Sequence, residues 1–246
     1  MKLRHFLLAW QLLTVIPLKR IYPAKKEDLA ASLTFFPVVG MGIGLILSLI
    51  NLAGSFFFSP LLANALVLIG WVWVTGALHL DGLADTIDGI SAGGDKKSIL
   101  KVMKDGAIGA KGAVSLICIL LLKFVLLNQI NIGIKNQVLF YVPVVSRWSM
   151  VLGAYFSPYA KKEEGMGKAY VDLVDFKEVL LTTLITVALG LAILRLSSLP
   201  FLGITLLTIF FWIVYLKRKI GGITGDTLGA MNETVETLGL FSFCLL

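Results

Sequence analysis

Hydrophobic residues in this chain form long, almost uninterrupted runs that are separated by short polar segments. A helix that spans a membrane needs roughly 20 mostly apolar residues, and six runs approach or reach that length. They predict spanning helices at residues 35–58, 61–80, 113–130, 138–156, 179–196 and 199–216. The apolar tail that ends at Leu246 is less well defined, and we expect it to re-enter the membrane as a seventh segment.

Two shorter segments have patterns typical of a membrane surface. Residues 3–16 are apolar but too short to span a bilayer, and Trp10 suits the interface between lipid and water. We therefore predict an N-terminal interfacial helix there. Lys97, Lys101 and Lys104 share one helical face with apolar residues largely opposite, which predicts a short amphipathic surface helix. These lysines face either anionic lipid or a substrate, and the sequence supports both interpretations equally.

The composition agrees with this pattern. The chain has 246 residues, of which 57% are hydrophobic and 15% charged, whereas a soluble domain carries about 25% charged residues. Cys118 and Cys244 both lie in apolar runs, so we expect core residues and no disulfide framework. Gly40 and Gly44 form a pair suited to close packing of helices. The predicted fold is all-α: a polytopic membrane helical bundle of six or seven transmembrane helices, forming a single domain over residues 1–246.

Positive charge is distributed unevenly along the chain. If the turns at residues 59–60, 131–137 and 195–198 lie on one side of the membrane, 18 of the 22 Lys and Arg residues lie on the other side. The positive-inside rule makes that second side cytoplasmic. The net charge of +7 therefore indicates a lipid bilayer as the partner rather than a nucleic acid. We expect a multi-pass protein of the cell membrane whose active site faces the cytoplasm.

Three carboxylates stand close together where the second predicted span ends. The segment H-L-D-G-L-A-D-T-I-D-G, residues 79–89, places Asp81, Asp85 and Asp88 at positions i, i+4 and i+7. On a helix these positions fall within about 40° of one another. Like charges raise the cost of ionising each other, and a divalent cation such as Mg²⁺ removes that cost while bridging to phosphates. The motif predicts a metal-phosphate site at the membrane surface; the alternative is a solvated acidic helix end.

A second motif follows the last predicted span. In G-G-I-T-G-D-T-L-G-A-M-N-E, residues 221–233, Asp226 and Glu233 again share one helix face. The charge distribution places both motifs on the cytoplasmic side, so their oxygen ligands and glycines are expected to meet there. Oxygen ligands for a metal, together with glycines that let backbone N–H groups approach an anion, favour phosphoryl or pyrophosphoryl transfer.

The remaining candidates are basic residues and one histidine. Lys123 and Arg147 lie inside predicted spans, where ionisable residues are costly and by default suggest function. Arg147 and Lys104 are our candidates for neutralising phosphate charge. A nucleophilic hydroxyl needs a base, for which His79 or one of the carboxylates is available. His79 lies about 200° around the helix from Asp81, which favours a supporting or structural role over a catalytic one.

The two long motifs together resemble those of the cobalamin synthase family, the adenosylcobinamide-GDP ribazoletransferases. The resemblance extends over nearly the whole chain. It includes Phe36-Pro37 with Gly40, Lys104-Asp105 with Gly109 and Gly112, Lys123, Ser146-Arg147 and residues 163–167. One departure is visible: Gly106-Ala107 stand where many members carry Ser-Arg. A phosphate contact by that arginine is therefore absent here or is supplied elsewhere, for example by Lys104 or Lys111.

The resemblance implies a specific reaction that requires Mg²⁺. A ribose hydroxyl of α-ribazole, or of its 5′-phosphate, attacks the cobinamide-bound phosphorus of adenosylcobinamide-GDP, and GMP leaves. The residues expected to act in catalysis and to hold Mg²⁺ are Asp81, Asp85, Asp88 and Asp226, with His79 added as a catalytic candidate only. Those expected to contact substrate or phosphate are Arg147, Lys104, Asp105, Thr227 and Glu233. A second copy of the chain and other corrinoid-pathway enzymes are further expected partners.

Three rival functions share part of this pattern. A CDP-alcohol phosphotransferase begins its motif D-G-x-x-A-R, of which only Asp81-Gly82 match. A prenyltransferase also uses aspartates with Mg²⁺ and pyrophosphate, but its N-D-x-x-D spacing is missing. A transporter would place charges near the middle of the membrane in discontinuous helices, whereas the aspartates here cluster at one face.

Overall fold

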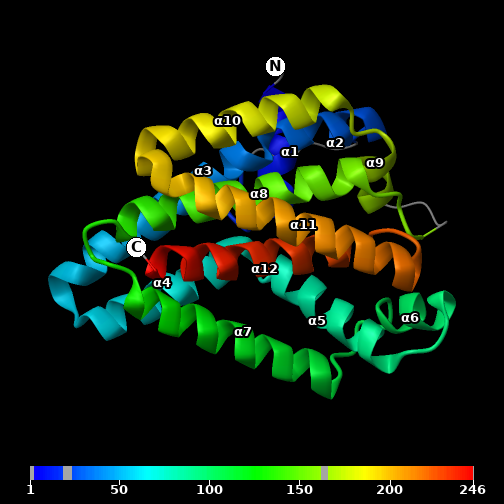
Figure 1. Ribbon diagram of the computed structural model, residues 1–246, viewed down its shortest axis with the longest axis horizontal. Helices are drawn as coiled ribbons and strands as arrows, with labels where there is room; N and C mark the ends of the chain where they lie inside the picture. The colour runs from blue at the N-terminus through cyan, green and yellow to red at the C-terminus, as the bar shows by residue number, and fades with distance from the viewer. Residues whose placement is uncertain (1–2, 19–23, 162–165, 246) are drawn as a thin grey trace.

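The computed structural model describes residues 3–18, 24–161 and 166–245 as a bundle of helices (Figure 1). The family positions at 163–165 lie outside the described residues. The described helices are, in chain order, α1 (Leu3–Leu13), α2 (Lys26–Ser32), the 3₁₀ turn η1 (Leu33–Phe35), α3 (Phe36–Phe57), α4 (Pro60–Thr75), α5 (Leu78–Ala92), α6 (Lys96–Val102), α7 (Ala110–Gln129), α8 (Lys135–Phe156), α9 (Met166–Asp172), α10 (Phe176–Leu194), the 3₁₀ turn η2 (Arg195–Ser197), α11 (Ser198–Ile220) and α12 (Gly225–Cys244).

The all-α prediction is confirmed for the described residues, but the count of six or seven membrane spans is not. Four helical stretches are long and apolar enough to cross a membrane, at Lys26–Phe57, Ala110–Gln129, Lys135–Phe156 and Phe176–Ile220, and the bent pair α4–α5 would be a fifth. The prediction counted α10 and α11 as two spans, whereas the structure gives them as one candidate stretch, Phe176–Ile220. It also counted α12 as a span, and α12 is not among the candidates. We therefore describe a membrane protein with four to five candidate spans. The expected helices at 3–16 and around 97–104 are present as α1 and α6.

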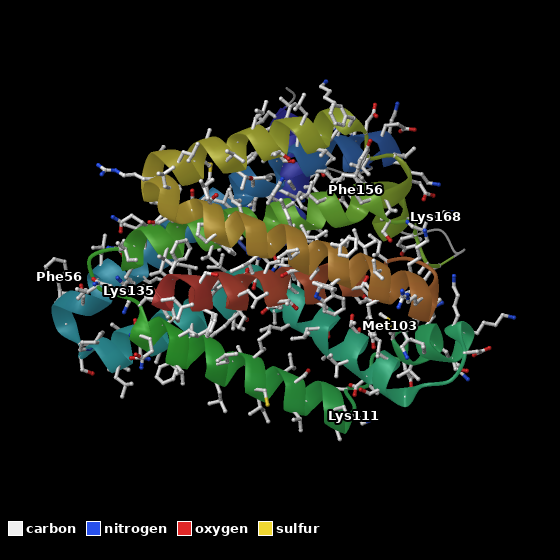
Figure 2. All side chains as sticks on the ribbon, viewed as in Figure 1. Phe56, Met103, Lys111, Lys135, Phe156 and Lys168 are labelled. Carbon is white, nitrogen blue, oxygen red and sulfur yellow. The ribbon has the colours of Figure 1, made fainter. Side chains whose placement is uncertain are left out.

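Apolar side chains cover much of the outside of the bundle. Phe56, Leu121, Phe210 and Phe211 are each about three-fifths exposed or more. A soluble monomer rarely exposes large contiguous apolar patches, so this surface fits a lipid environment. Figure 2 shows Phe56 at one end of the bundle and Lys168 at the other, as expected for opposite sides of a membrane.

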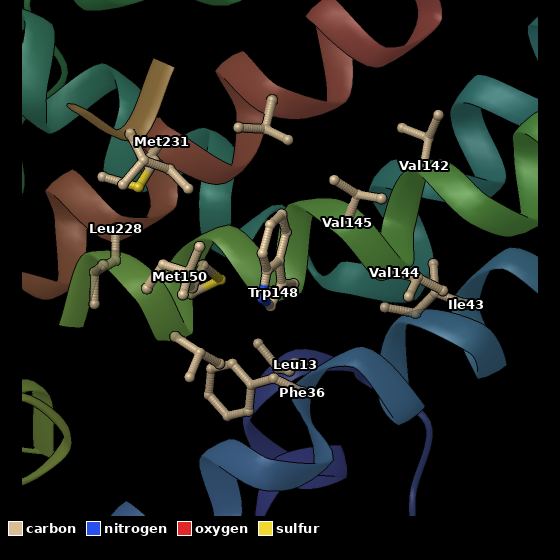
Figure 3. Close-up of a cluster of buried hydrophobic side chains, with 14 of the residues drawn as sticks. Leu13, Phe36, Ile43, Val142, Val144, Val145, Trp148, Met150, Leu228 and Met231 are labelled. Carbon is tan, nitrogen blue, oxygen red and sulfur yellow. The ribbon is translucent and has the colours of Figure 1, made fainter. Parts of the chain in front are cut away.

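Helix α8 lies at the centre of the bundle and packs against α3, α10, α11 and α12. Its contact with α3 depends on Gly40 and Gly44, because a Cβ on either glycine would collide with the α8 backbone at Pro143 or Phe140. This confirms the predicted close packing of that glycine pair. Buried apolar side chains from several helices fill the space around α8 (Figure 3); the labelled ones include Leu13, Phe36, Ile43, Val145, Trp148 and Met231.

Candidate active site

A sharp bend between α4 and α5 sets the direction of the first acidic motif. The axes of the two helices differ by 84°, so the predicted continuous span at 61–80 is wrong. Gly76 and Ala77 both adopt left-handed backbone angles, with φ of 59° and 56°. That conformation is unfavourable for a residue with a Cβ, so packing must hold Ala77 in it. The bend ends the span at Thr75 and directs α5 along α12.

The two sequence motifs meet along the contact between α5 and α12. A Cβ on Gly82 would lie 2.7 Å from the carbonyl oxygen of Asp226, and one on Gly229 would lie 3.2 Å from the backbone of His79. One glycine from each motif therefore allows the other helix to approach closely. This confirms that segments more than 130 residues apart in the sequence converge, as the charge distribution predicted.

Four aspartates lie at this junction, and we call them the carboxylate face: Asp81, Asp85, Asp88 and Asp226. Asp81 is exposed, and the other three are partly buried. Asp85 experiences repulsion from each of the other three and attraction from Lys161. Like charges held together in this way destabilise a fold unless a cation or a proton compensates them. The arrangement therefore suits a site that receives a positively charged ligand.

Asp88 also has a structural role. Its two carboxylate oxygens accept hydrogen bonds from the backbone N–H groups of Gly109 and Gly112, at 2.7 and 2.8 Å. Gly109 precedes the first residue of α7, so the carboxylate binds unpaired N–H groups at that helix start. A Cβ at either glycine would collide with Asp88. The two glycines of the K-D-x-x-x-G-x-x-G segment are thus explained by this contact, which the sequence alone did not indicate.

Asp226 is held by two neighbours at the start of α12. Lys161 donates to its Oδ2 at 3.2 Å, and the Thr224 hydroxyl donates to the same atom at 3.2 Å. Sequence reasoning missed Lys161, which lies in a polar loop far along the chain. Thr227, predicted to contact substrate, is buried and accepts a hydrogen bond from the backbone N–H of Thr224. Thr227 therefore completes the cap of α12, and among the described residues its hydroxyl and its backbone N–H form hydrogen bonds only with Thr224.

Arg147 and Glu233, both predicted to contact substrate, join a network inside the bundle. We call this set, made up of Lys123, Arg147, Glu233 and Glu236, the buried ion network. Lys123 Nζ lies 2.6 Å from Glu233 and 2.5 Å from Glu236, and Arg147 pairs with Glu236. All four side chains are at least 94% buried. Charges inside an apolar bundle must be paired with opposite charges, and this requirement explains the placement of Arg147 and Glu233.

His79 belongs to the same buried region. Its exposed fraction is 2%, and neither ring nitrogen has a hydrogen-bond partner among the described residues. The charges that act on its ring are those of Arg147, Glu236 and Lys123. The predicted orientation, away from the aspartates, is therefore confirmed, and the imidazole does not reach the carboxylate face.

Lys104 and Asp105 lie on a different part of the surface. Asp105 is exposed in the turn that follows α6, and Lys104 lines a cavity beside the same helix. Neither residue belongs to the carboxylate face. Lys111, the other residue considered for the missing arginine contact, donates to the carbonyl of Ser91 at 3.1 Å.

The carboxylate face has the right ligand chemistry for Mg²⁺ but is not a complete protein cage. Among the described residues, no three Asp, Glu, His or Cys side chains are close enough to hold a metal ion by themselves. Mg²⁺ is usually bound by one or two carboxylates together with waters and substrate phosphates. Asp81 and Asp85, which are reachable and carry the uncompensated charge, fit that partial ligand set. Asp88 and Asp226 already have hydrogen-bond partners.

Comparison with known proteins supplies the family. A family profile described as cobalamin-5-phosphate synthase matches residues 5–244. An adenosylcobinamide-GDP ribazoletransferase of Acetivibrio thermocellus is 34% identical over 243 residues, covering 99% of this chain and 98% of that protein. The protein of the same name in Geotalea daltonii is 35% identical over 240 residues, covering 98% of this chain and 96% of its own length. No solved structure matches the chain. This chain belongs to the cobalamin-5-phosphate synthase family.

Proposed function

We propose that this chain catalyses the step of cobalamin synthesis that joins adenosylcobinamide-GDP to ribazole. The observation that carries this proposal is the meeting of both acidic motifs at one carboxylate face, in a chain that belongs to this family. The hydroxyl oxygen of α-ribazole, or of its 5′-phosphate, forms a bond to the cobinamide-bound phosphorus. The bond from that phosphorus to the bridging oxygen breaks, and GMP leaves with the electron pair.

Asp81 and Asp85 would hold Mg²⁺, which when bound would neutralise charge on the substrate phosphates. Asp88 keeps α5 fixed to the start of α7 and thereby holds the neighbouring aspartates in place. Lys161 orients Asp226 and adds a positive charge at the edge of the face. We therefore assign positioning roles to Asp88 and Asp226. When the substrate arrives, Asp226 can exchange its hydrogen bond from Lys161 for a contact with the substrate.

The proton of the attacking hydroxyl goes to a carboxylate in this proposal. His79 is unsuitable because its ring is buried and faces the ion network. Asp85 is the best-placed acceptor, through the carboxylate oxygen that does not bind the metal, since it is partly exposed and lies among the other three aspartates. Positive charge on Lys161 then balances part of the negative charge that develops on the leaving phosphate.

The cytoplasmic orientation of the carboxylate face is part of the same proposal. It is supported by the excess of Lys and Arg at the end of the bundle that holds α6, α9 and the α11–α12 connection (Figure 1). Both substrates would reach the site from that side. A second copy of the chain and other corrinoid-pathway enzymes stay predicted partners.

The direct test measures GMP release by the full chain in detergent or liposomes. The substrates are adenosylcobinamide-GDP and α-ribazole, with Mg²⁺ or with EDTA. We expect release only with Mg²⁺, and a loss of about a hundredfold or more for Asp85→Asn, the range for removing a general base. Asp172→Asn is the matched control, because Asp172 is an exposed carboxylate at the end of α9.

Two results would contradict the proposal. Folded wild-type chain that consumes a CDP-alcohol or a prenyl pyrophosphate, but not adenosylcobinamide-GDP, would assign the carboxylate face to another reaction. GMP release that continues in EDTA would remove the metal from the mechanism. Full activity of Asp85→Asn would remove only the assignment of Asp85.

A further inference from the structure

A cavity rich in lysine lies beside the carboxylate face and has no role in the reaction as described so far. Its volume is about 760 Å³, within the range of roughly 300–1,000 Å³ that small-molecule sites occupy. Lysines approach it from two separate parts of the chain: α6 with its following turn, and the loop that carries Lys161. We call it the lysine cavity. Its charged lining residues are Asp95, Lys96, Lys97, Lys101, Lys104 and Lys161.

The charges of the lysine cavity do not balance. Among the described residues that line it, five lysines face one carboxylate, Asp95. That carboxylate is already engaged, because it accepts hydrogen bonds from the backbone N–H and the hydroxyl of Ser98, at 2.9 and 2.6 Å. Asp95 thus caps α6, and these bonds hold its pKa below the ordinary value. A concave surface with an excess of one sign concentrates ions of the opposite sign, so the cavity suits an anion with several charges.

The lysine cavity is connected to the carboxylate face through Lys161. This residue lines the cavity and also donates to Asp226 at 3.2 Å. Lys96 reaches the turn before α12 from the other side, since a Cβ on Gly221 would lie 2.8 Å from its Nζ. An anion held by these lysines would therefore lie next to the start of α12, where the second motif begins.

Shape and lining also distinguish the cavity from a flat patch that faces lipid. Leu100 and Ala160 contribute apolar walls between the lysines. A site with a few converging charges and an apolar wall is the usual arrangement for a ligand that has both a charged group and a ring. Lysines that serve only to attract anionic lipid need neither an apolar wall nor a contact with Asp226.

We propose that the lysine cavity binds the guanosine diphosphate portion of adenosylcobinamide-GDP and retains GMP after the bond breaks. This inference rests on the proposed function, because that function supplies the nucleotide. The lysines would neutralise the phosphate that leaves, while the carboxylate face acts on the phosphate that stays with the cobinamide. The same phosphate chemistry could instead come from α-ribazole 5′-phosphate or from lipid headgroups, and the experiment separates these sources.

The experiment measures binding of labelled GDP to the purified full chain in detergent by equilibrium dialysis. The test variant is Lys97→Gln/Lys101→Gln, and the control is Lys177→Gln/Lys219→Gln, which removes two exposed lysines outside the cavity. We expect the test variant to weaken GDP binding about tenfold or more, equivalent to about 1.4 kcal/mol. The control should bind as wild type, and thermal unfolding should be unchanged in both, because all four lysines are exposed.

Competition with three unlabelled ligands identifies the phosphate source. Unlabelled GMP should displace GDP from the wild-type chain, whereas α-ribazole 5′-phosphate and anionic phosphatidylglycerol vesicles should not. Displacement by α-ribazole 5′-phosphate would assign the cavity to the second substrate, and displacement by the vesicles alone would assign it to lipid. Equal GDP affinity of wild type and test variant would overturn the proposal outright.

Steady-state kinetics distinguish failure of this inference from failure of the proposed function. We expect the test variant to raise KM for adenosylcobinamide-GDP about tenfold and to leave KM for α-ribazole unchanged. A wild-type chain that releases GMP, with KM values unaffected by the lysine variant, would retain the function and reject the cavity. A wild-type chain that binds GDP through these lysines but never releases GMP would reject the function and retain a nucleotide site.

Discussion

The carboxylate face and the buried ion network both gather acidic residues, but they treat the charge in opposite ways. The network pairs two acids with two bases in the interior, and each of the four charges has an ion partner. The face holds four acids near the surface with Lys161 as the one cation in contact among the described residues. In an apolar interior, charge must be balanced by the chain itself. At an accessible surface an imbalance can persist where a ligand supplies the missing charge.

This difference separates structural from functional acids within a single helix. Helix α12 carries Asp226 in its first turn and Glu233 and Glu236 two to three turns later. The first residue lies at the edge of the carboxylate face, and the other two hold α12 to α7 and α8. Asp226 and Glu233 both carry a carboxylate and share one helix face, so their neighbours decide the role.

The largest effect is expected from breaking the buried ion network. Glu236→Gln removes the acid that pairs with both Lys123 and Arg147, which leaves two buried cations with too little negative charge. Loss of one partner of a buried pair costs about 3–5 kcal/mol. We expect the free energy of unfolding, measured by SDS titration of detergent-solubilised chain, to fall by that amount.

The control for this variant comes from the other region. Asp85→Asn removes one of four clustered like charges, so it should leave the unfolding free energy unchanged or raise it. Lys123→Met/Glu233→Met removes one charge of each sign and should cost less than Lys123→Met alone. If Glu236→Gln unfolds like wild type yet loses GMP release, the network belongs to the active site and the comparison is wrong.

A smaller effect is expected from separating the two motifs. Gly82→Ala places a Cβ about 2.7 Å from the backbone of Asp226, so α5 and α12 must move apart. Overpacking of this kind costs about 1–3 kcal/mol, and displacement of the aspartates should reduce GMP release more than it reduces stability. Both quantities are measured on the same preparation.

Gly203→Ala is the matched control for Gly82→Ala. Gly203 lies inside α11, and a Cβ there would have nothing within 4 Å. Alanine favours a helix over glycine by up to about 1 kcal/mol, so this variant should unfold no more easily than wild type and should keep its activity. Equal activity of Gly82→Ala and Gly203→Ala would show that the close contact of the motifs is not needed for catalysis.

The sequence was sufficient to predict features that depend on local pattern. Long apolar runs predicted most of the helices, and the spacing of Asp81, Asp85 and Asp88 predicted one helix that carries all three. The charge distribution predicted that both motifs converge. The bend at Gly76 and Ala77 was missed, because no proline marks it and Thr75 and Gly76 interrupt the apolar run only briefly.

The sequence did not predict which distant charged residues form ion pairs with one another. Arg147 and Glu233 were predicted to contact substrate because ionisable residues in apolar segments suggest function. Arg147 pairs with Glu236, 89 residues later in the chain, and Glu233 pairs with Lys123, so only the fold brings these charges together. An i, i+3 pair of glutamates facing two cations in predicted spans was the signal that could have indicated a neutral network. Lys161 offered no comparable signal.

The smallest effect is expected at Thr227, which lies between the two regions. Its Oγ1 accepts a hydrogen bond from the backbone N–H of Thr224 at 2.8 Å and completes the cap of α12. Thr227→Ala should therefore lower the unfolding free energy by about 1 kcal/mol, as loss of a cap does. KM for both substrates should stay at the wild-type value, because the hydroxyl is buried. Thr227→Ser, which keeps the hydroxyl, should restore most of the stability. An increase in KM for Thr227→Ala without loss of stability would return Thr227 to the substrate contacts and would extend the carboxylate face into the first turn of α12.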